Sequence, residues 1–268
     1  MKILIISGNH SRHLYIHKAV LQSGYECAAI VMEREDIIPK PPEKTLLRDA
    51  KNFNLHFKER FYKEKKAFGD LNPDDVFKDI LVKKCKPEHL NSIETSMFVN
   101  EFSPDIAFIF GVDIIKDPLM RSLPNIKVNL HLGLSPWYKG SATLFWPFYF
   151  VQPHYAGVTF HNITKFADAG DILHQCVPKL SKGDGIHDVS VKAVIKAKDD
   201  LLKLLEIYSA TKKWNFFKQK TTGRLFLTTD FKPFHLRVIY DLFNNKMIDF
   251  FYENKILMKT PRIIDGIN

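Results

Sequence analysis

Cysteine is scarce in this chain of 268 residues, which contains only Cys27, Cys85 and Cys176. The number is odd, and no two of them have the C-x-x-C spacing of zinc sites and redox dithiols. Small domains that depend on disulfides are rich in cysteine, so this content indicates free thiols in a reducing compartment. We therefore expect neither a disulfide framework nor a structural metal site, and we expect a cytoplasmic protein.

Long apolar runs are missing as well. No stretch approaches the roughly 20 apolar residues that a helix needs to cross a bilayer. The first eight residues read MKILIISG, an apolar run too short for a signal peptide, and we interpret it as a first β-strand. Internal repeats and low-complexity segments are absent. The sequence thus predicts a globular protein that does not associate with a membrane.

The dinucleotide-binding fingerprint G-x-G-x-x-G is also absent, although the start of the chain otherwise suits a doubly wound α/β domain. Residues 3–6 form a short apolar run typical of a buried parallel strand, and residues 27–32 form a second one. Between them, residues 14–23 have the apolar spacing of a helix. Because the glycine fingerprint is missing, we do not predict a nicotinamide cofactor.

The loop between the first strand and the first helix is rich in basic and titratable side chains. In doubly wound folds, ligands bind beyond the carboxyl ends of the strands, and the N-terminus of a helix favours an anion. We therefore predict a phosphate or pyrophosphate site here, with solvated loop residues as the alternative. Its residues are His10, Ser11, Arg12 and His13.

Positive charge is present in excess. Lys and Arg number 39 against 30 Asp and Glu, which gives a net charge of +9. A basic protein attracts anions such as nucleotides, nucleotide-sugars and tRNA. Much of the charge lies in local clusters, at residues 58–66 and 83–86, which we interpret as solvated faces. The charge therefore indicates an anionic ligand without selecting one.

The remaining pattern alternates between helices and strands. Residues 46–68 predict a long charged helix that ends at Gly69, and residues 76–82 have helical spacing. Further helices are expected at residues 91–102, 191–209 and 233–243, a strand or turn at residues 214–227, and strands at residues 106–110, 158–163 and 172–177.

This alternation predicts an α/β fold with a Rossmann-like, doubly wound, mostly parallel sheet. The composition changes near residue 212. We accordingly divide the chain into a catalytic domain at residues 1–209 and a short C-terminal α/β appendage at residues 210–268.

The segment VNLHLGLSPWYKG at residues 128–140 contains two polar side chains at the end of a predicted strand. Asn129 and His131 are two positions apart, so in an extended segment they share one face. His131 can transfer a proton near neutral pH, and the Asn129 amide can donate a hydrogen bond to a developing oxyanion. Taken alone, Asn-x-His fits an ordinary strand end with a hydrogen-bonded histidine better than it fits a catalytic site.

A second motif, about thirty residues later, changes this interpretation. A predicted strand at residues 157–161 is followed by a turn-prone segment and by ADAGDIL at residues 167–173. The combination of N-x-H, S-P-x-x-K-G and D-x-G-D-I-L resembles the folate-dependent formyltransferase family, which includes glycinamide ribonucleotide, methionyl-tRNA and sugar-nucleotide N-formyltransferases. The resemblance implies that Asn129, His131 and Asp168 are the catalytic residues and that Asp171 is structural.

The resemblance also implies where two substrates bind. The formyl donor of the family, N10-formyltetrahydrofolate, would lie between the connector at residues 111–118 and the loop before Asp168, although the connector also reads as the apolar start of a helix. The implied donor-binding residues are Val112, Ile114, Ile115, Thr164, Lys165, Phe166 and Ala167. The implied acceptor-binding residues are His10, Ser11, Arg12, His13, Trp137, Tyr138, Lys139 and Gly140.

Two features of the motif region qualify these implications. Lys139 replaces the arginine that is usual in the family, which keeps the charge but loses the planar guanidinium. Trp137 and Tyr138 can equally anchor the loop as buried aromatic residues. The resemblance implies no metal.

We therefore expect transfer of a formyl group to the primary amine of a nucleotide-linked amino-sugar, such as a dTDP-amino sugar of lipopolysaccharide O-antigen or other surface-polysaccharide biosynthesis. The alternatives are a methionyl-tRNA formyltransferase, a hydroxyornithine formyltransferase of siderophore synthesis, and a folate-binding protein without turnover. The short C-terminal segment and the basic loop favour a small anionic acceptor over tRNA. DNA and membranes are not expected partners, and a homodimer is the expected assembly.

Overall fold

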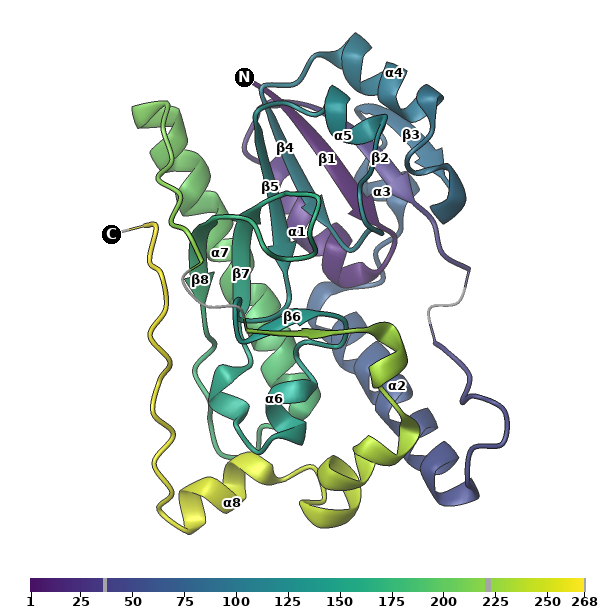
Figure 1. The fold of residues 1–268 in the computed structure, drawn as a ribbon, viewed down its shortest axis with the longest axis vertical. Coiled ribbons are helices and arrows are strands. Elements are labelled where there is room, and N and C mark those ends of the chain that lie inside the picture. Colours follow the sequence, from purple (N-terminus) through teal and green to yellow (C-terminus); the bar gives the residue numbers. More distant parts are fainter. Residues whose placement is uncertain (36–37, 220–222, 268) are drawn as a thin grey trace.

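A sheet of seven strands forms the centre of the computed structural model, which describes residues 1–35, 38–219 and 223–267. Its strands are β1 (Lys2–Gly8), β2 (Glu26–Met32), β3 (Leu81–Cys85), β4 (Ile106–Phe110), β5 (Ile126–His131), β7 (Val158–Asn162) and β8 (Ile172–Cys176). Their order across the sheet is β3-β2-β1-β4-β5-β7-β8 (Figure 1). The first four pairs are parallel and the last two antiparallel. The expected α/β fold with a mostly parallel sheet is confirmed.

Helices cover both faces of the sheet. They are α1 (Ser11–Leu21) and α7 (Ile186–Thr211) on one face, and α4 (Ile93–Phe102) and α5 (Leu119–Ser122) on the other. On β1, Ile3 packs into the first layer and Leu4 into the second, and both are fully buried. Because successive side chains of a strand point to opposite faces, a strand between two helical layers reads as a continuous apolar run. Each such side chain stabilises the fold by about 1.5–3 kcal/mol.

The helix predicted over residues 76–82 is wrong. Helix α3 (Pro73–Val76) ends at Val76, and β3 begins five residues later as the edge strand beside β2. Leu81, Val82 and Lys84 of this strand are exposed. An exposed edge strand has no apolar alternation for sequence analysis to detect. Its lysines also hinder pairing with a further strand.

The long charged helix is confirmed as α2 (Leu47–Phe68), which ends at Gly69 as expected. Among the described residues, the chain after α7 adds no further strand to the sheet and only touches the edge of β8, through Phe217 and Ile264. Instead β9 (Arg224–Phe226) pairs in parallel with β6 (Tyr138–Gly140), a short strand that follows β5 in the sequence. The strand or turn predicted at residues 214–227 contains β9, and its residues 220–222 lie outside the described part of the chain.

The helix predicted over residues 233–243 is helical but irregular. It starts with a 3₁₀ turn, η4 (Pro233–His235), and continues as a π-helical stretch, η5 (Val238–Leu242). Helix α8 (Met247–Glu253) follows. The remaining short elements are η1 (Pro87–His89), η2 (Pro153–Tyr155), η3 (Thr228–Asp230) and α6 (Trp146–Tyr149).

A second hydrophobic cluster joins these C-terminal elements to α2 and α6. Phe53 of α2, Trp146 of α6, Phe226 of β9 and Ile248 of α8 are all buried in it. The rings of Trp146 and Phe226 stack with their centroids 4.6 Å apart. Many of the abundant aromatic side chains therefore pack in this cluster.

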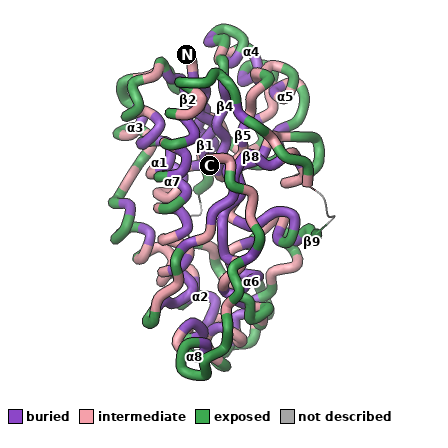
Figure 2. The backbone as a smooth tube through the Cα atoms, turned by 90° about the vertical axis from the view of Figure 1, so that its left-hand side faces the viewer, coloured by how far each residue is buried: buried purple, intermediate pink, exposed green. Residues whose placement is uncertain are grey.

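The last described residues are extended and follow β8 (Figure 1). The backbone N–H of Gln175 donates to the carbonyl of Ile264 at 2.8 Å, so this segment covers the outer edge of β8. Figure 2 shows the central strands as the most continuously buried part of the chain. Among the described residues, no helix combines the length and the apolar character that crossing a membrane requires.

Candidate active site

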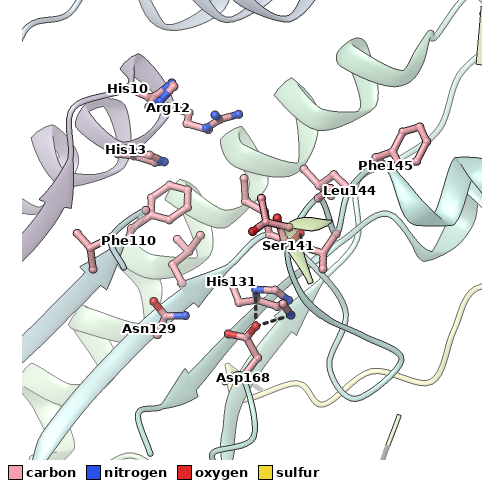
Figure 3. Close-up of a pocket in the computed structure, with 18 of the residues that line it drawn as sticks. His10, Arg12, His13, Phe110, Asn129, His131, Ser141, Leu144, Phe145 and Asp168 are labelled. Carbon is pink, nitrogen blue, oxygen red and sulfur yellow. Dashed lines mark hydrogen bonds and ion pairs between the residues drawn. The ribbon is translucent and has the colours of Figure 1, made fainter. Parts of the chain in front are cut away.

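A cavity of about 880 Å³ lies at the carboxyl ends of the parallel strands. Doubly wound folds bind ligands at this edge, and the volume is within the range of about 300–1,000 Å³ that is usual for small-molecule sites. In Figure 3, Asn129, His131 and Asp168 lie together on one side of the cavity. His10 and Arg12 lie across it, near the start of α1.

Four polar side chains form one connected group, which we call the polar site: Asn129, His131, His161 and Asp168. Asn129 and His131 share a face of β5, and the antiparallel register sets His161 of β7 opposite Asn129. Nε2 of His161 lies 3.2 Å from Nδ2 of Asn129 and 3.2 Å from Oδ1 of Asp168. The other carboxylate oxygen of Asp168 lies 3.3 Å from Nδ1 of His131.

Both ring nitrogens of His131 face oxygen acceptors. Nε2 donates to the backbone carbonyl of Tyr138 at 2.9 Å, and Nδ1 faces the Asp168 carboxylate. Burial lowers the pKa of His131, while the negative charge of Asp168 acts in the opposite direction. The imidazole is therefore mainly neutral at pH 7, and the carboxylate stabilises its protonated form. His131 can thus accept and return a proton with little movement.

Asp168 is ionised at neutral pH. Burial alone would raise the pKa of this carboxyl, but the charge of His131 and the hydrogen bond from His161 outweigh burial. The backbone N–H of Gly140 also donates to the carboxylate at 2.7 Å. Together these contacts hold the pKa of Asp168 well below its usual range.

The loop that carries Asp168 has an unusual backbone. Asp168 has a φ of +47°, in the left-handed region that residues other than glycine, asparagine and aspartate seldom enter. A Cβ atom on Gly170 would lie 1.8 Å from the carbonyl oxygen of Asn162. The loop can pass this close to β7 only because residue 170 has no side chain, which gives the D-x-G motif a structural reason.

Sequence analysis missed His161, which lines the cavity and joins Asn129 to Asp168. Nδ1 of His161 lies 2.8 Å from the carbonyl oxygen of Asn162. The available signal was its place at the end of a predicted strand that follows the Asn-x-His strand. An antiparallel pairing of the two strands had to be assumed before that signal was useful.

The predicted phosphate site lies at the cavity. Arg12 of α1 forms a salt bridge with Glu64 of α2 at 2.7 Å. His13 is buried against Gly111, where a Cβ atom would lie 2.1 Å from its ring. His10 and Arg12 also line the cavity, whereas Ser11 lies outside its described lining.

Burial controls the protonation of the histidines in this loop. Burial, with the charge of Arg12 as the next cause, lowers the pKa of His10 to about 3. The same two causes lower the pKa of His13 well below its ordinary value. Both rings are therefore neutral at pH 7, and the fixed positive charge here belongs to arginine.

Helices α2 and α7 add groups that sequence analysis did not single out. Arg60 and His56 of α2 and His187 of α7 line the cavity near Arg12. The rings of His56 and His187 lie 4.4 Å apart, and Nδ1 of His56 lies 3.0 Å from the hydroxyl of Tyr240. Burial lowers the pKa of Arg60, and the charge of Arg12 adds to this effect, but a guanidinium stays protonated at neutral pH.

These side chains share no motif, and only the packing of three helices brings them together. We call this region of the cavity the basic end. Its residues are His10, Arg12, Arg34, His56, Arg60 and His187.

Most of the residues implied for donor binding line the part of the cavity that we call the donor end. It adjoins the basic end, because Asp113 pairs with Arg34 and Gly111 packs against His13. Gly111 begins this segment of the lining. The implied residues that line the cavity are Val112, Ile114, Ile115, Thr164, Phe166 and Ala167. Lys165 lies outside the described lining, and its ammonium lies 5.1 Å from the ring centre of Phe166. Ile114 and Phe166 are more than half exposed, so their apolar surface is accessible to a ligand.

The loop after His131 behaves differently from the expectation. Gly140 lines the cavity, but the side chains of Trp137, Tyr138 and Lys139 lie outside its described lining. Tyr138 is buried in the second hydrophobic cluster, and its hydroxyl donates to Gln152 at 3.0 Å. Trp137 packs edge-on against Tyr155. Anchoring of the loop accounts for both aromatic residues.

A second group of titratable side chains lies in the core, away from this cavity. His174, Cys176 and Asp200 have the ligand types of a metal site. Asp200, however, already pairs with Lys196 and accepts from Nε2 of His174 at 3.1 Å. Nδ1 of His174 accepts the backbone N–H of Gly266 at 3.2 Å. These partners satisfy the polar groups, so we assign the cluster a structural role.

A doubly wound α/β sheet with an Asn-x-His strand end, a nearby aspartate and a cavity at the carboxyl edge defines a class of group-transfer enzymes. Residues 1–205 match the sequence profile of the family described as formyl transferase. The chain therefore belongs to the formyl transferase family.

Comparison with individual proteins supports the fold. The chain is 33% identical over 104 residues to the bifunctional polymyxin resistance protein ArnA of Wigglesworthia glossinidia brevipalpis. The aligned segment covers 37% of this chain and 15% of that protein. The chain thus spans a small part of the length of this curated relative.

Two solved structures share the architecture. Phosphoribosylglycinamide formyltransferase from Anaplasma phagocytophilum is 16% identical, with a TM-score of 0.56 over 85% of this chain and 98% of that chain. The N-formyltransferase from Helicobacter canadensis, in complex with folinic acid and dTDP-3-aminofucose, is 20% identical, with a TM-score of 0.54 over 87% of this chain and 73% of that chain.

Proposed function

We propose that this protein transfers a formyl group from N10-formyltetrahydrofolate to a primary amine. The observation that carries the proposal is the buried group of Asn129, His131 and Asp168 at the ligand-binding edge of the sheet, in a chain of the formyl transferase family. Amide and imidazole N–H groups can stabilise an oxyanion, and an ionised carboxylate beside them can assist proton transfer.

In the proposed reaction, the unprotonated amine of the acceptor attacks the formyl carbon, and the bond from that carbon to N10 of the folate breaks. Negative charge develops on the formyl oxygen, to which the Asn129 amide and an N–H of the protonated form of His131 donate. Asp168 orients His131 and helps to move the amine proton to N10. The products are a formylated amine and tetrahydrofolate, and the step requires no covalent bond to the protein.

The lining of the donor end combines apolar side chains with backbone polar groups, which suits a folate. Val112, Ile114 and Phe166 supply apolar surface, and this surface continues to the polar site through Asn129. A flat heterocycle would bury its faces against such side chains, with its polar edge toward the backbone of the connector. We propose that the implied residues of the connector and of the Asp168 loop bind the donor, Lys165 with its main chain.

We propose a nucleotide-linked amino-sugar as the acceptor, as used in surface-polysaccharide synthesis. Three guanidinium groups, those of Arg12, Arg34 and Arg60, line the basic end. Guanidinium N–H groups donate charge-assisted hydrogen bonds to phosphate oxygens, so this lining suits a diphosphate. The structural neighbour from Helicobacter canadensis holds a ligand of this kind.

The C-terminal elements support the same assignment. Leu227 and Phe231 line the cavity next to Phe57 of α2, which gives the basic end an apolar margin suited to a nucleobase. We propose that residues 1–209 form the catalytic domain and that residues 210–268 complete its acceptor side. The free cysteines of the described residues are consistent with a cytoplasmic enzyme.

Calorimetry with folinic acid and with thymidine diphosphate tests this function first. Binding of both ligands, followed by formylation of a dTDP-amino sugar in the presence of N10-formyltetrahydrofolate, is the expected result. Binding of folinic acid without the nucleotide would transfer the proposal to another amine, such as tRNA or hydroxyornithine. A protein that binds neither ligand would contradict the proposal.

The Arg12→Ala variant tests the acceptor assignment. We expect the KM for the acceptor to rise at least about tenfold, because a charge-assisted hydrogen bond contributes about 1.5–3 kcal/mol. The KM for the folate should stay unchanged. Lys18→Ala is the matched control, since Lys18 is an exposed cation on the same helix. Equal effects on both substrates would reject a phosphate-binding role for Arg12.

A further inference from the structure

The segment that follows α7 returns to the loop that carries Asp168. The backbones of Ile172 and Phe217 exchange two hydrogen bonds, each of 2.8 Å, at the point where β8 begins. Ile172 is paired on its other side with His161 of β7. The bridge therefore joins Phe217, through Ile172, to the strand that carries His161 of the polar site.

Two residues further along, the side chain of Gln219 contacts the Asp168 loop directly. Its Nε2 donates to the backbone carbonyl of Asp168 at 2.9 Å and to that of Gly170 at 2.8 Å. An amide nitrogen has two hydrogens, so a single side chain can serve both carbonyls. Gln219 thus holds the backbone on both sides of Ala169.

The Asp168 loop needs such support. A residue other than glycine in the left-handed region is strained, and surrounding contacts must compensate for this strain. The carboxylate of Asp168 has fixed partners in His131 and His161. If the backbone of Asp168 relaxed, its carboxylate would rotate away from both histidines. A displacement of about 1 Å in a catalytic group can reduce the rate of a reaction by about 100-fold.

We propose that Gln219 is a positioning residue, which holds the Asp168 backbone so that the carboxylate stays in contact with His131 and His161. Gln219 lies outside the segment that matches the formyl transferase profile. The C-terminal part of the chain thus contributes to the chemistry as well as to the packing. This inference rests on the proposed function for its effect on turnover, and on the hydrogen bonds alone for its effect on the loop.

Gln219→Glu is the decisive variant, because it preserves the size of the side chain and replaces the donor with an acceptor that the two carbonyls repel. We expect kcat to fall at least tenfold, with KM values for both substrates changed less than threefold. Gln219→Ala should show a smaller loss in the same direction. Lys218→Ala, at the exposed neighbouring position, is the matched control and should leave kcat unchanged.

Amide hydrogen exchange measures the positioning effect without any turnover. The N–H of Gly140 donates to the Asp168 carboxylate, so its exchange should accelerate at least tenfold in Gln219→Glu. Amides of β1 should keep their protection, which separates a local effect from general destabilisation.

The two assays distinguish the failure of each proposal. A wild-type protein without formyl transfer would overturn the proposed function, and unchanged Gly140 exchange in Gln219→Glu would overturn the role of Gln219. An active wild type whose Gln219→Glu variant keeps a normal kcat would also overturn that role. Accelerated exchange together with a lowered kcat supports it.

Discussion

The two carboxylate oxygens of Asp168 meet three groups, the Gly140 amide, His131 and His161. These contacts keep the carboxylate ionised and in one orientation. His131 by contrast is held neutral by burial and is ready to take a proton. The environments of the two residues thus favour different protonation states at the same pH, as an acid-base pair requires.

We expect Asp168→Asn to lower kcat at least about 100-fold, because an amide cannot assist the proton transfer. His131→Ala should lower kcat by about 10²–10³ through loss of an oxyanion donor. Since both residues act on the same proton, the double variant should lose little more than the worse single variant. Steady-state kinetics provide the measurement, with folinic acid binding as the control for folding. Fully additive losses would contradict a shared step.

At the residue scale, strand spacing places Asn129 beside His131, and the resemblance to formyltransferases adds Asp168, but neither identifies what surrounds them. Asn129 and His131 share a face because side chains two positions apart in a strand point the same way. Arg60, by contrast, reaches the cavity only through the packing of α2. Trp137 stays a predicted acceptor residue, although its side chain packs against Tyr155 and lies outside the described lining of the cavity. Such outcomes depend on tertiary contacts that no local pattern encodes.

The short strands β6 and β9 link the two parts of the chain at the element scale. Gly140 ends β6, and its N–H donates to Asp168. On β9, the Phe226 ring packs between Trp146 and Tyr138. The position of Gly140 therefore depends on how well β9 is anchored in the second hydrophobic cluster.

We expect Phe226→Ala to destabilise the protein by about 3–5 kcal/mol, the usual cost of deleting a buried phenylalanine ring. Its kcat should fall as well, because β6 loses its support. Leu225→Ala, on the other face of the same strand and 47% exposed, should change stability by less than about 0.5 kcal/mol. Urea unfolding of both variants gives the comparison. Equal destabilisation would show that β9 is not anchored through Phe226.

Element prediction from the sequence succeeds for the buried strands and fails at the exposed edge strand. The apolar run of β1 identifies a strand between two helical layers. The exposed strand β3 has the composition of a solvated segment, and its identity follows only from pairing with β2. The irregular geometry of η5 likewise arises from tertiary packing of a segment that has ordinary helical spacing.

Buried, neutral histidines occur in several parts of the molecule, so their effect on stability belongs to the molecule as a whole. Burial lowers the pKa of His17 and of His187 to about 3, and His10 behaves alike. A histidine of the unfolded chain titrates near 6.5. Between these values the unfolded chain binds more protons than the native protein, so the free energy of unfolding decreases as the pH falls.

We therefore expect the free energy of unfolding to decrease steadily from pH 7 to pH 5, by up to about 1.4 kcal/mol per pH unit for each such histidine, and the urea midpoint to decrease with it. His17→Leu should reduce this slope. It should also stabilise the protein at pH 7 by about 1 kcal/mol, because neither ring nitrogen of His17 has a hydrogen-bond partner among the described residues. The exposed His89 provides the control, and His89→Gln should leave the slope unchanged. A midpoint independent of pH would contradict the burial argument.

The pairing of β6 with β9 has a consequence for the synthesis of the protein on the ribosome. All seven strands of the sheet are complete once residue 176 has been translated, and the catalytic motifs are already present in the nascent chain. Gly140 gains its strand partner only when residue 226 leaves the exit tunnel. A nascent chain stalled before that point would contain every strand of the sheet, but Gly140 would still lack its strand partner. We therefore expect formyl transfer only from chains whose translation has passed this point.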